Sequence, residues 1–200
     1  MPEEVTTRER ILEATYSCVA RHGLDRTTLE DVARESGLSR ATIYRVFPGG
    51  REDLLREVVV WELERFFTQL ATAVAAEPTF VGLIEEGLMY ARAAIMKHAV
   101  LQTILRTEPE RLLPLMTLEA ERPVRFIVEY LTPLLEREES ESRLRPGITV
   151  GDAAEYTARL VLSLIASPGS WDLSDPEVTR VLVREHLLAG VLTAEALEAP

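Results

Sequence analysis

The chain has 200 residues, of which 46% are hydrophobic and 28% are charged, a composition typical of a globular protein with enough apolar surface for a core. A single cysteine excludes an internal disulfide, the polar amino terminus is unlike a secretory signal, and no uncharged run reaches the ~20 residues of a membrane-spanning helix. We therefore expect a cytoplasmic protein built as one large domain or two small ones.

The net charge of −11 is distributed unevenly along the chain. Residues 1–50 contain seven arginines and eight acidic residues, so this segment is almost neutral. The other 150 residues carry nearly all of the excess negative charge. Long-range attraction to a polyanion would be weak, and binding to nucleic acid would depend on a few local arginines. The acidity thus weakens a nucleic-acid function without excluding it.

Residues 6–22 are predicted to form the first helix. Its apolar and small residues recur at helical spacing: Ile11, Ala14, Thr15, Cys18 and Val19. Gly23 stands where a helix commonly ends in a left-handed residue. We interpret Cys18 as a small buried hydrophobe rather than a reactive thiol, and His22 as an exposed residue of the last turn rather than a ligand.

Residues 28–47 are predicted to form two short helices joined by a tight turn. Thr28 can cap the first helix, with Asp31 three residues later as the partner in a capping box. Gly37 suits the positive φ of a sharp turn, and Ser39 is a good cap for the second helix.

The second of these helices has two different faces at about 100° per residue. Apolar residues share the inner side: Ile43, Val46 and Phe47. Small, polar and basic residues occupy the outer side and its flanks: Arg40, Ala41, Thr42, Tyr44 and Arg45. A short helix with such a face can enter a DNA major groove, which is roughly 12 Å wide. The pattern therefore predicts a recognition helix.

After the break at Pro48-Gly49-Gly50, helical spacing of apolar residues continues from Arg51 to Ala76. A helix of that length extends about 40 Å at ~1.5 Å per residue, which is enough to join two domains. Arg51 lies in its first turn and is either an ordinary solvated arginine or a phosphate contact beside the recognition helix.

The remainder of the chain is predicted to be helical throughout. Further helices are expected at residues 80–97, 99–106, 118–138, 149–166 and 176–196, with a turn-like piece at 112–116 and an exposed loop at 136–145. The predicted fold is all-α: a three-helix DNA-binding head with a helix-turn-helix (residues 1–50), followed by a larger helical ligand-binding and dimerisation domain (residues 51–200).

The last two predicted helices are rich in Ala, Leu and Val, which permits close approach of another helix. These residues either complete the core of their own subunit or pack against a second subunit. We expect the second arrangement, because a short recognition helix usually needs a symmetric partner. The residues concerned are Ala153, Ala154, Ala158, Leu160, Val161, Leu164, Val178, Val181, Leu182, Leu188, Ala189 and Leu192.

Several aromatic or polar-tipped residues lie in apolar surroundings and are candidates to line a ligand pocket, although each could equally be a core residue. They are Tyr90, His98, Gln102, Phe126, Tyr130 and Trp171. The three histidines are dispersed, and no Gly-rich phosphate loop or nucleophile elbow is present. We therefore expect no enzymatic activity, no metal site and no cofactor.

Residues 8–55 resemble the amino-terminal domain of TetR-family transcriptional regulators. The positions that carry the resemblance are Ile11-Leu12-x-Ala14, Gly23, Thr27-Thr28, Val32-Ala33, Gly37-x-Ser39, Thr42-x-Tyr44, Phe47 and, after a basic residue, Leu54-Leu55. Two positions depart from the commonest pattern: the turn after Phe47 has an extra glycine, and Arg51 replaces the usual lysine.

The resemblance implies a homodimer that binds a palindromic operator in double-stranded DNA and is released as a repressor by an unidentified small-molecule effector. It also implies dimerisation through the last two helices. By position, bases would be approached by Arg40, Ala41, Thr42 and Arg45. Phosphates would be held by Thr27, Thr28, Tyr44 and Arg51, and Ser39, the cap of the recognition helix, completes the predicted interface. The alternative is a helical protein-interaction or ligand-binding protein that does not bind DNA.

Overall fold

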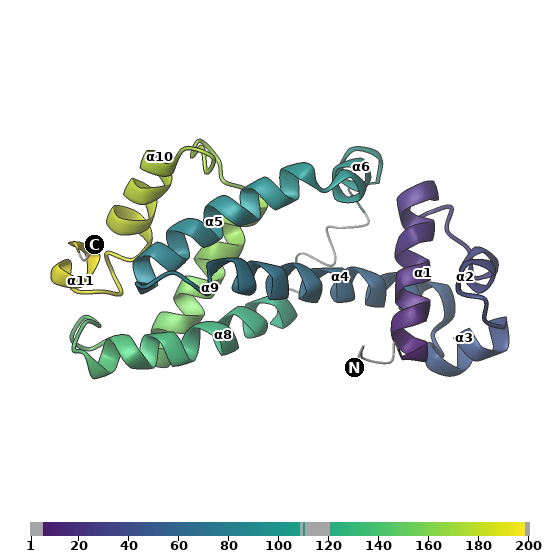
Figure 1. Cartoon of the computed structure of the whole chain (residues 1–200), viewed down its shortest axis with the longest axis horizontal. Coiled ribbons are helices and arrows are strands. Elements are labelled where there is room, and N and C mark those ends of the chain that lie inside the picture. Colours follow the sequence, from purple (N-terminus) through teal and green to yellow (C-terminus); the bar gives the residue numbers. More distant parts are fainter. Residues whose placement is uncertain (1–5, 109, 111–120, 199–200) are drawn as a thin grey trace. The chain divides into compact units, whose positions relative to one another are not determined.

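A computed structural model describes residues 6–108, 110 and 121–198, and the regular elements of that part of the chain are helices (Figure 1). The predicted all-α fold is confirmed. The chain divides into two compact units, Met1–Arg65 with His98–Glu119, and Phe66–Lys97 with Ala120–Pro200. None of the described helices is both long and apolar enough to cross a bilayer.

The first unit contains α1 (Thr7–His22), α2 (Leu29–Ser36), α3 (Arg40–Val46) and the beginning of α4 (Gly50–Val74). Its core collects the inward faces of all four helices, and the fully buried members include Ile11, Leu12, Val32, Ile43 and Leu54. The predicted three-helix head is therefore confirmed, and its core continues into α4 beyond residue 50. Burial of these side chains stabilises helices that would be too short to persist alone.

A second cluster in the same unit joins α6 (Ala99–Thr107) to the end of α1. Ile104 of α6 packs with Val19, Leu24 and Leu55 in this cluster. The His98 ring caps α6, because its Nδ1 accepts a hydrogen bond from the Leu101 amide at 3.0 Å. An element far along the sequence thus helps to support the loop between α1 and α2.

The second unit is built around α5 (Phe80–Lys97), α8 (Glu121–Ser140) and α9 (Val150–Ala166), together with the carboxyl-terminal part of α4. The chain continues through α10 (Pro176–Val181), a π-helix η1 (Leu182–Leu187) and α11 (Ala194–Glu198). Thr149 and Asp175 cap α9 and α10, as expected for residues that favour a helix start.

The exposed loop predicted at residues 136–145 is wrong in its first half, because α8 continues to Ser140. Glu138, only 6% exposed, accepts hydrogen bonds from two nitrogens of Arg143, at 2.7 and 2.9 Å. This two-pronged pair satisfies the buried carboxylate and draws the following turn back against α8. A run of charged residues was therefore misinterpreted as a solvated loop.

The single helix predicted at residues 176–196 is also wrong. The π-helix ends at Leu187, and a short turn containing Gly190 precedes α11. Leu192 forms an isolated antiparallel bridge with Leu144, and the Thr193 amide donates to the Arg143 carbonyl at 2.9 Å. These long-range bonds use backbone groups that a continuous helix would require for its own ladder.

Most of the small residues assigned to subunit packing are buried within the second unit itself. Ala153, Ala154, Ala158 and Leu188 are at most 1% exposed, so they complete the core of their own chain. Leu160 and Leu164 are half-buried, and Val181 is 37% exposed. The turn-like piece predicted at 112–116 and the beginning of the helix predicted at 118–138 lie outside the described residues.

Candidate nucleic-acid interface

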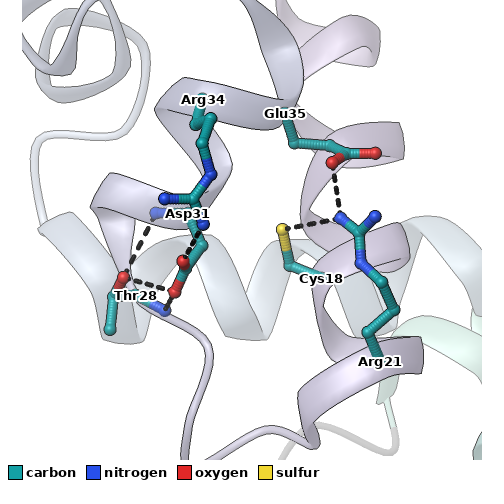
Figure 2. Close-up of polar contacts among 6 residues, drawn as sticks. All are labelled: Cys18, Arg21, Thr28, Asp31, Arg34 and Glu35. Carbon is teal, nitrogen blue, oxygen red and sulfur yellow. Dashed lines mark hydrogen bonds and ion pairs between the residues drawn. The ribbon is translucent and has the colours of Figure 1, made fainter.

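Thr28 and Asp31 fix the start of α2 through reciprocal hydrogen bonds (Figure 2). The Asp31 amide donates to the Thr28 hydroxyl oxygen at 3.2 Å, and the Thr28 amide donates to the Asp31 carboxylate at 3.2 Å. The hydrogen bond from the Thr28 hydroxyl holds the pKa of Asp31 below its usual value. The carboxylate therefore stays ionised at the positive end of the helix dipole, and the predicted capping box is confirmed.

The turn between α2 and α3 has the predicted chemistry. Gly37 adopts φ 66°, in the left-handed region that glycine enters without steric cost. The Ser39 hydroxyl then accepts the Thr42 amide at 3.1 Å and caps α3. These two residues set the direction in which α3 leaves the turn, and hence the direction in which its outer face points.

The two faces of α3 differ sharply in burial, as the sequence predicts. Ile43 is fully buried and Phe47, just beyond the helix, is 3% exposed. Four residues of the opposite side are exposed, while Thr42 is half-buried and Ser39 is exposed at the cap. The exposed four are Arg40, Ala41, Tyr44 and Arg45. The core thus holds one side of the helix and leaves the other accessible to a partner.

Tyr44 is 44% exposed, and its ring lies against the backbone of Gly50. A Cβ at Gly50 would stand 3.3 Å from the Tyr44 ring, and Gly50 has φ 70°. The glycine that ends the break after α3 therefore accommodates both the turn into α4 and the tyrosine beside it. The sequence marks this residue only as an extra glycine.

The exposed arginines of the first unit fall into two groups. Arg8 pairs with Glu57, Arg21 with Glu35 and Arg34 with Asp31, the last two pairs being drawn in Figure 2. Arg40 and Arg45, in contrast, have no carboxylate within ion-pair distance among the described residues, and the same holds for exposed Arg10 and Arg26 outside α3. The outer face of α3 therefore carries two uncompensated guanidinium groups.

Arg51 is not free to hold a phosphate in this structure. Its Nε donates to the Thr27 carbonyl at 2.7 Å, and its Nη2 donates to the carbonyls of Leu24 and Asp25 at 2.7 and 2.8 Å. Its remaining nitrogen pairs with Glu52. The guanidinium thus clamps the loop between α1 and α2 to the first turn of α4. This contact differs from both roles predicted from sequence, a solvated arginine and a phosphate contact.

The side chain of Thr27 is likewise committed within the protein. It is 1% exposed, and its hydroxyl donates to the Gly23 carbonyl at 2.7 Å. This geometry speaks against a phosphate contact through the Thr27 hydroxyl, because the group is turned into the loop. Thr28, the next residue, is exposed at the start of α2 and keeps the position expected of a phosphate contact.

Two further interpretations from sequence concern Cys18 and His22. Cys18 is fully buried, and burial raises the pKa of its thiol, so the interpretation as a small core residue is confirmed (Figure 2). His22 is exposed in the last turn of α1, also as predicted. The described residues contain no group of three or more metal-ligating side chains.

A cavity of about 50 Å³ lies in the second unit, between residues of α4, α5, α8 and α9. Phe126 and Tyr130, two of the predicted effector residues, line it. The other four predicted residues lie outside this cavity: Tyr90 is half-buried on α5, His98 caps α6 and bonds Glu62, Gln102 belongs to α6, and Trp171 packs its ring on His186.

The sequence interpretation missed the apolar residues that form most of this cavity. They recur at spacings of three and four along their helices, for example Phe67, Leu70, Ala71 and Val74 on α4. That periodicity is visible in the sequence, but it indicates a core-facing stripe equally well. The cavity is lined mainly by apolar residues, whereas the residues predicted from sequence were mostly polar-tipped.

The chain is similar to known proteins at two levels, in the sequence of its first part and in its overall fold. Residues 11–58 match the family model described as bacterial regulatory proteins, tetR family. An uncharacterized HTH-type transcriptional regulator of Mycobacterium tuberculosis (strain CDC 1551 / Oshkosh) is 42% identical over a match covering 28% of this chain and 35% of that protein. The chain thus matches about a third of the length of this curated relative.

Solved structures match nearly the whole chain at low identity. The TetR family repressor AlkX from Dietzia sp. strain DQ12-45-1b is 23% identical with a TM-score of 0.64, covering 90% of this chain and 95% of its own. The SmeT–triclosan complex is 20% identical with a TM-score of 0.58, covering 97% and 98%. At these identities the similarity establishes the fold of both units.

Proposed function

We propose that this chain, whose residues 11–58 match the family model of bacterial regulatory proteins, tetR family, is a sequence-specific DNA-binding transcriptional regulator. One observation carries the proposal: the exposed outer face of α3 presents two arginines together, Arg40 and Arg45, and neither has a carboxylate partner among the described residues. Unpaired guanidinium groups on a short helix are suited to the major groove.

The proposed division of contacts follows from the chemistry of each group. Arg40 and Arg45 can each offer two parallel N–H donors to guanine acceptors, with Ala41 and Thr42 beside them against base edges. The hydroxyls of Thr28, Ser39 and Tyr44 and the amino termini of α2 and α3 are placed in the positions where such proteins hold phosphates. The side chains of Thr27 and Arg51 have no direct role in this scheme.

We propose further that two copies of the chain bind a palindromic operator. The recognition helices of a dimer enter successive major grooves about 34–36 Å apart. The distance between the two helices must therefore match the distance between the half-sites. An apolar stripe suitable for the dimer contact runs along α9 through Tyr156, Leu160 and Leu164, with exposed Val181 on α10. Tyr156, which is 43% exposed, is the most accessible member of the α9 stripe.

The proposed regulator is a repressor that a small molecule releases from DNA. Support comes from α4, which contributes Leu54 and Val58 to the core of the first unit and Phe67 and Ala71 to the cavity of the second. A ligand that favours one position of α4 would bias the arrangement of the two recognition helices. SmeT, which has a similar fold, has been solved with triclosan bound.

A non-enzymatic role in the cytoplasm, where chromosomal DNA lies, accords with this proposal. The competing function is a helical ligand-binding or interaction protein that makes no DNA contact. Selection of bound duplexes from a random DNA library separates the two. We expect enrichment of a palindromic sequence after a few rounds, whereas the same collection of sequences before and after selection would contradict DNA recognition.

A further inference from the structure

The cavity of the second unit is lined by apolar atoms almost throughout. Four helices contribute to its lining, for example through Phe67 of α4, Leu88 of α5, Phe126 of α8 and Val161 of α9. Among the described residues, none that lines the cavity carries a charge. A carboxylate or ammonium group placed there would lose its hydration without gaining a counter-ion, at a cost of several kcal/mol.

One lining residue offers a polar group. The hydroxyl of Tyr130 has no hydrogen-bond partner among the described residues, and burial alone raises the pKa of Tyr130, with no neighbouring charge contributing. The phenol is therefore neutral and able both to donate and to accept a hydrogen bond. It can satisfy a single uncharged polar atom, such as a hydroxyl or carbonyl oxygen, at the end of an apolar molecule.

The open space depends on a glycine in the middle of α5. Gly87 lines the cavity, and a Cβ built on it would have no atom within 4 Å. A glycine inside a helix is less stabilising than alanine, so this residue leaves space at the expense of helix stability. An aliphatic side chain at position 87 would extend directly into that space.

We propose that the ligand of this cavity is an uncharged molecule with an alkyl chain and one hydrogen-bonding oxygen, the chain lying over Gly87 and the oxygen on Tyr130. The identification of this ligand as the effector rests on the proposed regulatory function. The 50 Å³ cavity is partly open to solvent, so the part of the chain that it does not enclose extends toward the protein surface.

Three probes of equal chain length test the charge requirement: 1-octanol, octanoate and octylammonium. Each is titrated into the full-length protein without DNA, and binding is measured by calorimetry and by the shift of the unfolding temperature. We expect 1-octanol to bind at least about tenfold more tightly than either ion, the equivalent of ~1.4 kcal/mol. Equal or tighter binding of octanoate or octylammonium would overturn the proposal.

Two variants test the location. Gly87→Leu should fill the space and weaken 1-octanol binding at least about tenfold, while Tyr130→Phe should weaken it roughly three- to tenfold through loss of one hydrogen bond. Gly151→Ala is the control, because Gly151 is a second helical glycine with ample room and lies outside the cavity. Undiminished 1-octanol binding by Gly87→Leu, with its fold intact by circular dichroism, would place the ligand elsewhere.

These measurements separate the ligand proposal from the regulatory one. Because no DNA is present, selective 1-octanol binding supports the ligand chemistry even when the protein fails to enrich any sequence from the DNA library. Conversely, an enriched palindrome together with no preference for 1-octanol would preserve the regulator and reject this ligand. Failure of the ligand proposal can therefore be distinguished from failure of the regulatory proposal.

Discussion

Arg45 and Arg51 lie close in sequence but face different surroundings. Arg45 is exposed on α3 without a described partner, whereas Arg51 donates to the carbonyls of Leu24, Asp25 and Thr27. The three carbonyls converge because the loop between α1 and α2 folds back on the start of α4. A planar guanidinium can donate to all three carbonyls at once, so the side chain of Arg51 stabilises the fold of this loop.

Replacement of Arg51 by lysine tests this structural role. A lysine keeps the charge but cannot span three carbonyls, so we expect Arg51→Lys to lower the free energy of unfolding by about 1–3 kcal/mol. Urea denaturation measures the change. Arg159→Lys, at an exposed ion pair with Glu155, should change stability by less than about 0.5 kcal/mol.

The two possible roles of Arg51 predict opposite results. A phosphate contact would leave the stability of Arg51→Lys near that of the wild type and preserve its charge on DNA. A clamp lowers the stability and leaves the salt dependence of DNA binding unchanged in the folded protein, because no phosphate contact is lost. Wild-type stability in the lysine variant would therefore contradict the clamp.

At the scale of the element, the cap of α6 contains a titratable group. The His98 ring accepts the Leu101 amide at Nδ1, while its Nε2 lies 3.1 Å from the Glu62 carboxylate and 3.5 Å from the Tyr16 hydroxyl. The hydrogen bond to Glu62 raises the pKa of His98 above its ordinary value of 6.5, although burial opposes the shift and protonation of Nδ1 would remove the bond that it accepts from Leu101. Arg65, which also pairs with Glu62, lowers it slightly.

The raised pKa predicts how stability depends on pH. Because His98 binds its proton more tightly in the folded state, its contribution is complete below pH 6.5 and is lost as pH rises through the raised folded pKa. Glu62→Gln should therefore lose more stability, relative to wild type, at about pH 5.5 than at about pH 8.5. Urea denaturation at both values measures the difference.

A control variant and a second measurement complete the test. Glu155→Gln removes an exposed carboxylate from α9 and should show no such change with pH between those two values. The His98 ring, followed by NMR, should titrate at a lower pH in Glu62→Gln than in the wild type. A stability difference that is constant across the pH range would show that the Glu62 pair does not control this histidine.

Helix boundaries could be predicted from sequence where local chemistry determines them. Thr28, Gly37 and Ser39 mark the ends of α2 and α3, and their caps and turn form as expected because the bonds lie within four residues. The end of α8 and the break before α11 depend instead on Glu138 with Arg143 and on the bridge from Leu144 to Leu192. The bridge joins residues far apart in sequence, and the Glu138–Arg143 pair lies beyond the four residues that a helix cap spans, so neither has a clear signature in a single sequence.

In the candidate site, too, only the features that depend on local sequence could be predicted. The exposed face of α3 could be predicted, because helical periodicity alone decides which of its residues point away from the core. The engagement of Arg51 and Thr27 with backbone carbonyls could not, since it depends on how a loop folds back. The cavity was missed for a further reason: apolar stripes such as that of Phe67 and Val74 occur on every core-facing helix.

At the scale of the whole molecule, two subunits are required to bind the two halves of a palindromic operator. The proposed contact includes Tyr156, which is 43% exposed on α9, so Tyr156→Arg should place a charge in the interface and weaken dimerisation at least about tenfold. Sedimentation in the analytical ultracentrifuge at micromolar concentration measures this. Met96→Arg, at a 54% exposed residue of α5, is the matched control and should remain dimeric.

Three results of the sedimentation experiment would contradict that interface. A wild-type protein that is monomeric at micromolar concentration would remove the symmetric partner on which palindrome recognition depends. A Tyr156→Arg variant that dimerises as tightly as the wild type would place the contact on another surface. Loss of dimerisation in Met96→Arg alone would point to α5.

The central claim is that the outer face of α3 reads DNA, and the affinity of Arg45→Ala for the selected duplex tests it most directly. Fluorescence anisotropy compares this variant with Arg159→Ala, which removes the same charge from an exposed ion pair on α9. We expect Arg45→Ala to lose about 1–3 kcal/mol of binding free energy and to relax sequence preference at one position of each half-site, while Arg159→Ala binds as the wild type does. Wild-type affinity and sequence preference in Arg45→Ala would contradict the account.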